Sequence, residues 1–203
     1  MSKLPEEIMK LFNLARQPEE ELRLPAIESL ITITDGLAIK QEKYEDLLNT
    51  FFLMVNADSR EKLVKLIIRA ATRITDSEVA TFFQYFADKE TLRFSSLIGA
   101  TADTLQDLEI PAKTGIVGKV VQTKAPLIVN DVSREPLFNP ETDKKTGFKT
   151  RSILAVPVLD KEEKLIGVIE VLNRKDGAYN EEDQGLLNLL AQNVAISYKL
   201  FGF

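Results

Sequence analysis

Glu170 is the one carboxylate in the stretch from Leu165 to Leu172, which is otherwise apolar apart from Gly167. Because the side chains of a strand alternate between its two faces, Glu170 would share one face with Val168 and Leu172. A buried carboxylate is costly unless it is paired, hydrogen-bonded or protonated. The donor that satisfies it is either another residue of the chain or a bound ligand, and this strand alone leaves both open.

Two further stretches carry groups that suit a polar ligand. The polar segment at residues 136–150 leads into an apolar strand, and its hydroxyl groups belong to Thr142, Thr146 and Thr150. Thr114 precedes an apolar segment that predicts a helix over 115–122, with Thr114 as its N-cap. The unpaired N–H groups and the dipole of such a helix start suit an anion.

Two absent residue types exclude much catalytic chemistry. The chain contains no cysteine and no histidine. Disulfides, thiolate nucleophiles, Ser-His-Asp triads, thioether-linked chromophores and histidine ligands for zinc or haem are therefore excluded. The sequence shows no nucleophile–base pair, no metal cluster and no paired carboxylates. We therefore expect a protein that is not an enzyme and holds no cofactor and no metal.

The composition is that of an ordinary globular protein, with 44% hydrophobic and 28% charged residues in 203. A net charge of −5 argues against a nucleic-acid partner, because phosphates are bound by clustered Lys and Arg. No apolar run reaches the roughly 18 residues of a membrane helix, and the N-terminus lacks a secretory signal. We expect a cytoplasmic location, without nucleic-acid or membrane partners.

The order of expected elements predicts an α+β fold. Residues 1–36 read as a helical segment interrupted by Pro18 and Pro25, and residues 37–203 as the domain proper. Helices are expected over 37–55, 59–74 and 181–201, strands over 79–86, 91–98, 127–129, 151–159 and 164–172, and a helical turn within 139–146. These strands predict a central antiparallel sheet of five or six strands. The long terminal helices would cover one face, and the short helical segments the other, with Glu170 pointing into the space between.

Three passages give the chain a resemblance to a known family. They are Gly115 to Val121, Asn139 to Pro157, and Val168 through the last helix, within about residues 40–201. Their order resembles a GAF domain, whose sheet is PAS-like. The middle passage resembles the GAF domains that regulate cyclic-nucleotide phosphodiesterases and some bacterial adenylyl cyclases. That subset carries an Asn-Lys…Phe…Asp-Glu motif, and the matching residues here are Asn173, Arg174, Tyr179 and Asp183, followed by Gln184.

The resemblance implies both an internal ion pair and a ligand site. The pair would join Arg174 to Asp183. Residues 136–150, called the lid segment below, would close over the ligand. The implied ligand-binding residues are Thr81, Ile116, Val117, Asn139, Asp143, Thr146, Thr150 and Glu170. Where members place an aromatic and an acid against the purine, this chain has Leu97 and Ile98. The choice between cAMP, cGMP and another ligand therefore stays open.

Two hypotheses follow for the function. One is a regulatory GAF domain in signal transduction that binds cAMP or cGMP and signals through its terminal helices. The alternative is a non-catalytic GAF dimerisation or scaffold module whose pocket is empty or takes a different small ligand. In either case we expect a homodimer through the terminal helices. The apolar residues that suggest it are Phe51, Phe52, Tyr198, Leu200 and Phe201.

Overall fold

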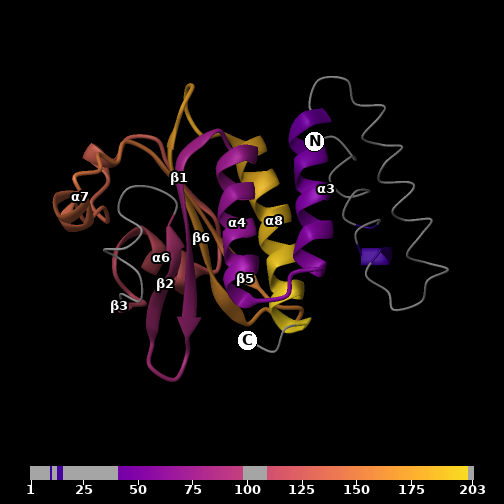
Figure 1. The fold of residues 1–203 in the computed structure, drawn as a ribbon. Helices are drawn as coiled ribbons and strands as arrows, with labels where there is room; N and C mark the ends of the chain where they lie inside the picture. Colours follow the sequence, from indigo (N-terminus) through magenta and orange to yellow (C-terminus); the bar gives the residue numbers. More distant parts are fainter. Residues whose placement is uncertain (1–9, 11–12, 16–40, 98–108, 201–203) are drawn as a thin grey trace. The chain divides into compact units, whose positions relative to one another are not determined.

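The computed structural model describes residues 10, 13–15, 41–97 and 109–200 (Figure 1). Most of the predicted N-terminal segment, together with Ile98 and Phe201, lies outside the described residues. The chain divides into two compact units, residues 1–48 and 49–203. Helix α3 (Gln41–Val55) begins in the first unit and ends in the second. The sheet and the helices that pack on it belong to the second unit.

A six-stranded sheet forms the centre of this unit, which confirms the α+β prediction. Its strand order is β3-β2-β1-β6-β5-β4, and every neighbouring pair is antiparallel. The strands are β1 (Ser77–Phe86), β2 (Thr91–Leu97), β3 (Glu109–Pro111), β4 (Leu127–Val129), β5 (Ile153–Leu159) and β6 (Leu165–Arg174). Only β3 was not predicted, because three residues that include a proline show no alternating pattern. The central strands β1, β6 and β5 carry the core.

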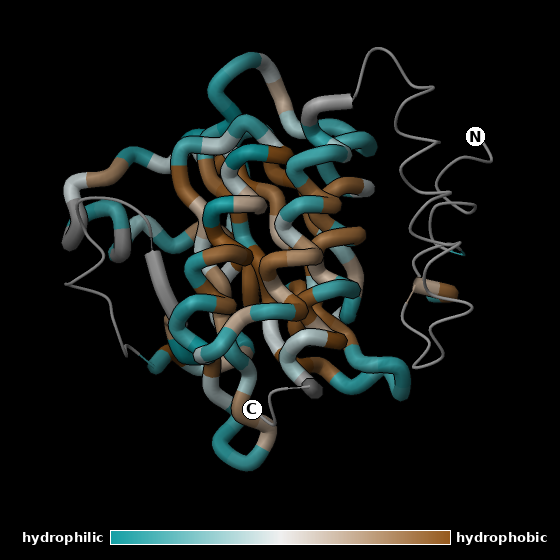
Figure 2. Tube along the Cα trace, turned by 45° about the vertical axis from the view of Figure 1, so that its right-hand side comes forward, coloured by the Kyte–Doolittle hydropathy of each residue, from teal (hydrophilic) through white to brown (hydrophobic). Residues whose placement is uncertain are grey.

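Helices α4 (Arg60–Ile74) and α8 (Glu181–Leu200) cover one face of the sheet (Figure 1). Ser59 caps α4, because its hydroxyl accepts from the backbone N–H of Lys62 at 3.3 Å. Asn180 caps α8 in the predicted way, accepting from the backbone N–H of Glu182 at 2.9 Å. In Figure 2 the hydrophobic residues concentrate in the strands and on the helix faces turned toward them.

The other face is covered by shorter elements. These are α6 (Gly115–Thr123) and the 3-10 turn η1 (Val132–Arg134), with α7 (Glu141–Thr146) further out on the same side (Figure 1). The buried apolar residues of this layer come from the strands and from α6 and η1 themselves, and they are Phe83, Leu92, Phe94, Ala112, Ile116, Val117, Val120, Val129, Val132, Ile153, Ala155 and Val168. The predicted division into terminal helices on one face and lid helices on the other is confirmed.

Helix α3 departs from the predicted apolar stripe. Phe52 and Val55 were expected on the inward face, but they are 73% and 55% exposed. Met54, which the pattern omitted, is fully buried, and Phe51 is 9% exposed. The inward residues follow an i, i+3 spacing, and Phe52 and Val55 each lie one residue further along, about 100° around the helix.

Candidate functional site

Glu170 lies at the middle of the central strand β6. In the strand register it is opposite Thr81 of β1 and Ala155 of β5. Its neighbours on this face, Val168 and Ala155, belong to the apolar core beneath α6. Glu170 is 9% exposed, and among the residues that the structure describes its carboxyl group has no hydrogen bond and no ion pair. The inward orientation read from the alternation is thus observed.

Burial changes the protonation of this carboxyl group. It raises the pKa of Glu170 from 4.5 to about 8, and the charge of Asp143 adds to the effect. Removal from water disfavours the charged form of an acid, and a like charge nearby does the same. At neutral pH Glu170 is therefore mostly protonated. A neutral carboxyl group offers a ligand one donor and an acceptor.

The start of α6 faces the same core. Ile116 and Val117 are 4% and 6% exposed and pack with the residues around Glu170. Thr114 occupies the predicted N-cap position with extended backbone, but its side chain makes no capping hydrogen bond. The first backbone bond of the helix runs from the N–H of Gly118 to the carbonyl of Thr114 at 3.0 Å. The N–H groups before Gly118 therefore have no acceptor within the helix.

The carboxylate of Asp143 ties α7 to the end of the lid segment, just before β5. Asp143 of α7 accepts from the backbone N–H and from the hydroxyl of Thr150, both at 2.7 Å. Asn139 is exposed, and its Oδ1 accepts at 3.0 Å from the backbone N–H of Glu141, the first residue of α7, whose N-cap position is Pro140. Thr146 ends α7, and its side chain lies outside the described part of the structure.

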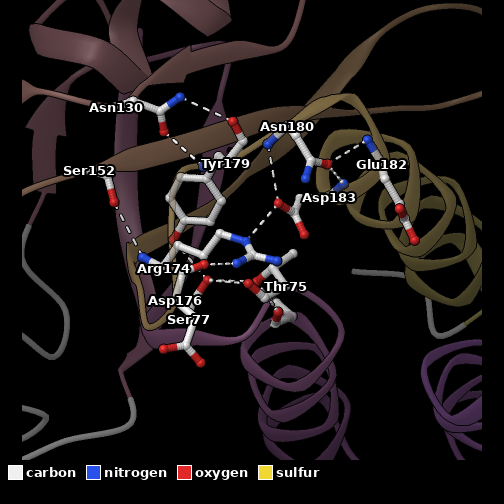
Figure 3. A network of polar contacts seen from close by, with 11 residues as sticks. Thr75, Ser77, Asn130, Ser152, Arg174, Asp176, Tyr179, Asn180, Glu182 and Asp183 are labelled. Carbon is white, nitrogen blue, oxygen red and sulfur yellow. Dashed lines mark hydrogen bonds and ion pairs between the residues drawn. The ribbon is translucent and has the colours of Figure 1, made fainter. Parts of the chain in front are cut away.

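A second polar cluster lies where β6 ends and α8 begins (Figure 3). Nε of Arg174 donates to Oδ2 of Asp183 at 2.8 Å, and the two side chains are only 16% and 2% exposed. This is the ion pair that the motif implies. The hydrogen bond to Asp183 raises the pKa of Arg174. Oδ2 of Asp183 also accepts from the backbone N–H of Asn180 at 3.1 Å, so the pair joins the end of β6 to the first turn of α8.

Tyr179 is held at both its backbone and its side chain. Its hydroxyl lies 2.7 Å from the Ser77 hydroxyl, and burial raises the pKa of the phenol. Asn130 accepts from the Tyr179 N–H at 2.8 Å and donates to its carbonyl at 3.0 Å (Figure 3). Tyr179 is buried, so the aromatic residue of the motif is part of the packing between β1 and the start of α8.

The comparisons identify the family. A family model described as GAF domain matches residues 57–197. This chain belongs to the GAF family. A cGMP-specific 3',5'-cyclic phosphodiesterase from Drosophila pseudoobscura pseudoobscura is 35% identical to it over 85 residues, or 41% of this chain. The chain spans 8% of the length of that relative.

Two solved structures share the GAF fold of this chain. The GAF domain of a phosphoenolpyruvate-protein phosphotransferase from Coxiella burnetii superposes with a TM-score of 0.72 at 15% identity, covering 81% of this chain and 98% of that chain. A free methionine-R-sulfoxide reductase from Neisseria meningitidis, solved with its substrate, has a TM-score of 0.65 at 17% identity, covering 77% of this chain and 88% of that chain. At these identities the likeness shows the fold alone.

The GAF fold brings most of the predicted site residues together. Thr81 lies beside Glu170 in the register, and Ile116 with Val117 packs in the same core. Asp143 lies close enough to act on Glu170 and is bonded to Thr150. Asn139 is exposed and bonds locally to the Glu141 N–H, and the side chain of Leu97 is not among those described.

Several residues of the polar cluster were not predicted from the sequence, among them Asn130 and Ser152. Asn130 follows β4, and the Ser152 hydroxyl accepts from the backbone N–H of Arg174 at 3.2 Å. A polar residue at the end of an apolar strand is a weak signal, since it fits an ordinary turn equally well. Among the side chains that the structure describes, no three acidic residues gather to form a possible metal site. Similarly, no helix within 41–97 or 109–200 is long and apolar enough to cross a membrane.

Proposed function

We propose that this GAF domain is a small-molecule sensor that binds a cyclic nucleotide on the sheet face beneath α6 and α7. The observation that carries the proposal is Glu170, a buried carboxyl group with no hydrogen-bond partner among the described residues. Buried polar groups are nearly always hydrogen-bonded, so a ligand that pairs with Glu170 would remove an energetic penalty. Binding would then favour the conformation in which the lid segment is closed.

The surrounding groups suit the parts of a cyclic nucleotide. The unpaired N–H groups at the start of α6 suit its cyclic phosphate, because a helix N-terminus attracts an anion. The protonated Glu170 and the Thr81 hydroxyl, which face each other across β6 and β1, suit the hydroxyl or base-edge groups. The similarity to a cGMP-specific phosphodiesterase supports the same class of ligand.

Calorimetric titration with cAMP and with cGMP tests the proposal directly. At least one nucleotide should give a saturable signal, and comparing the two titrations identifies which nucleotide binds. Glu170→Met should weaken binding by about tenfold or more, because it removes both the donor and the acceptor. Ile169→Met is the matched control, since the neighbouring residue of β6 is also buried but lies on the opposite face of the strand. It should leave the affinity within about twofold, as expected for a volume-conserving swap.

The absence of a signal would be equally decisive. If neither nucleotide produces heat or a thermal shift at millimolar concentration, the chain is not a cyclic-nucleotide sensor. Equal weakening by Glu170→Met and Ile169→Met would show that Glu170 makes no specific contact with the nucleotide and that both changes act through stability.

The second candidate function is a GAF dimerisation module, and the exposed apolar residues of α3 favour it. Phe52, Leu53 and Val55 are 73%, 49% and 55% exposed. Phe51 and Tyr198, which the sequence also suggested as contacts, are buried in the chain. The homodimer stays a prediction. Size-exclusion chromatography with light scattering should give twice the chain mass at micromolar concentration, and Phe52→Ser should shift the protein to monomer. A monomeric wild type contradicts the prediction.

A further inference from the structure

A single side-chain amide, that of Asn173, holds the backbone on both sides of Thr150. Its Nδ2 donates to the carbonyl of Lys149 at 2.8 Å, and its Oδ1 accepts from the N–H of Arg151 at 2.6 Å. The same oxygen accepts from the N–H of Ser152 at 3.3 Å. A carboxamide can bracket a residue in this way because it carries both a donor and an acceptor.

Asn173 is suited to this position by its backbone as well. It is 0% exposed, and its φ of 56° lies in the left-handed region that Asn tolerates better than most residues. Its second amide hydrogen bonds to Oε2 of Glu78 at 2.8 Å. A buried amide whose donors and acceptor are all paired has one well-defined orientation. Asn173 therefore provides a fixed reference point at the end of β6.

The element held by Thr150 is α7, the helix of the lid segment. Both the N–H and the hydroxyl of Thr150 donate to the carboxylate of Asp143, which lies on α7. The amide of Asn173 fixes the peptide groups that flank Thr150. The contacts therefore continue from the end of β6 to α7.

The next residue, Arg174, holds the opposite side of the sheet. Its Nε donates to Asp183 in the first turn of α8 at 2.8 Å, and its backbone N–H donates to the Ser152 hydroxyl at 3.2 Å (Figure 3). Asp183 is almost fully buried, so this pair cannot be exchanged for water without a large penalty. Two consecutive residues of β6 thus hold two elements on opposite faces.

We infer that Asn173 is a positioning residue that couples the lid segment to the first turn of α8. Displacing α7 breaks the bonds from Thr150 to Asp143, which loosens the bracket around Thr150 and, through Asn173, the backbone that carries Arg174. All of these contacts lie within the chain, so the coupling requires no particular ligand. The inference therefore stands or falls separately from the proposed nucleotide.

Amide hydrogen exchange of Thr150, followed by NMR on the full chain, tests the bracket. Asn173→Gly keeps the left-handed backbone but removes the amide, and it should speed the exchange of the Thr150 N–H about five- to hundredfold. Asn130→Ala is the matched control, because Asn130 brackets Tyr179 with the same two kinds of hydrogen bond. It should change the exchange of Thr150 by less than about twofold. Equal effects of the two variants would overturn the inference.

A double-mutant comparison tests the coupling itself. Arg174→Gln breaks the pair to Asp183, and it should raise the exchange rate of Thr150 several-fold when Asn173 is present. In the Asn173→Gly background the same change should have no further effect, because the connection is already lost. If Arg174→Gln leaves the exchange rate of Thr150 unchanged, no coupling passes through Asn173. The same follows if the effects of Arg174→Gln and Asn173→Gly on that rate multiply in the double variant. Arg174→Lys, which keeps the charge but loses the planar guanidinium, replaces Arg174→Gln if that variant does not fold.

Discussion

The two faces of the sheet differ in what they bury. Toward α4 and α8 the central strands present Phe82, Leu154 and Ile169, each at most 1% exposed, and the ring of Phe82 meets Tyr198 of α8 edge-on at 6.3 Å. Toward α6 and α7 the same strands present Thr81 and Glu170 among apolar neighbours. The first face is a closed apolar core, whereas the second retains polar groups at its centre.

This difference separates stability from function within one sheet. Burying an aliphatic side chain stabilises the fold by about 1.5–3 kcal/mol, while an unpaired buried polar group costs energy. A polar group at the middle of a core therefore needs a compensating role. The closed face stabilises the domain, and that stability allows the other face to keep Glu170. Four predictions test this comparison, from the largest expected effect to the smallest.

Leu154→Ala should produce the largest loss of stability. Leu154 is fully buried on the face toward α8, so its truncation leaves a cavity and should lower the free energy of unfolding by about 2–5 kcal/mol. Leu137→Ala is the control, because Leu137 is 42% exposed, and it should cost less than about 0.5 kcal/mol. Urea denaturation measures both. Similar values for the two variants would mean that the closed face does not carry the stability.

Glu170→Gln should remove a pH dependence of stability that arises on the face toward α6 and α7. The pKa of Glu170 in the folded chain is about 8, above its ordinary value of 4.5. Because the folded state holds the proton more tightly than the unfolded state, the stability from this group is fully present below pH 4.5. It declines as the pH rises, by up to about 1.4 kcal/mol per pH unit, until the folded-state pKa is passed.

Urea denaturation at pH 6 and at pH 8 measures this effect. Between these two values the wild type should lose about 2 kcal/mol more than Glu170→Gln, which cannot titrate. Equal losses in the two proteins would show that Glu170 is charged in the folded chain and is satisfied by a partner.

Gly115→Ala and Gly185→Ala should change stability in opposite directions. Gly115, at the start of α6, has a φ of 69°, which an L-residue adopts at a cost of about 1–2 kcal/mol. Gly185 lies inside α8 with open space where a Cβ would be, so alanine there should stabilise by about 0.5–1 kcal/mol. Thermal unfolding of both variants provides the measurement. Stabilisation by Gly115→Ala would contradict the left-handed backbone conformation of Gly115, which orients the N–H groups at the start of α6.

The sequence was sufficient for much of this fold. Alternation placed Glu170 inward, the Thr114–Gly115 pair located the start of α6, and the acids after Asn180 located the start of α8. Each of these signals is local, since it depends on residues within one or two turns or on one strand. Periodicity failed for α3, because Phe51 and Phe52 are both apolar and the sequence does not say which one faces inward.

The polar contacts of the site could not be derived in the same way. Asn173 and Arg151 are 22 residues apart in the chain, and Asn130 and Tyr179 are 49 apart. Such pairs depend on the strand register and on the exact path of the loops. Asn139 illustrates a local contact instead. The resemblance implies that it binds the ligand, which stays a prediction, and in this structure its side chain accepts from the backbone N–H of Glu141 two residues further along.

Asp143→Asn should have the smallest effect, and it separates the two causes that act on Glu170. Burial is the larger cause of the raised pKa, and the charge of Asp143 is the smaller. Asparagine removes that charge but keeps an oxygen that can accept from Thr150. The pH at which Glu170 titrates in the folded chain should therefore fall by about one unit or less.

The measurement is the titration of Glu170 by carboxyl-carbon NMR, with Glu141→Gln as the control. Glu141 also lies on α7 and is exposed, and its carboxylate pairs with Lys144 at 2.7 Å. Changing it removes the same charge without acting on the buried carboxyl group. If the pKa of Glu170 fell to its ordinary value in Asp143→Asn, the charge of Asp143 alone would cause the raised pKa. The face beneath α6 would then be open to water. An unchanged pKa would mean that the lid segment lies too far from Glu170 to close over a shared ligand. The small intermediate shift fits a buried carboxyl group beneath a lid that approaches it.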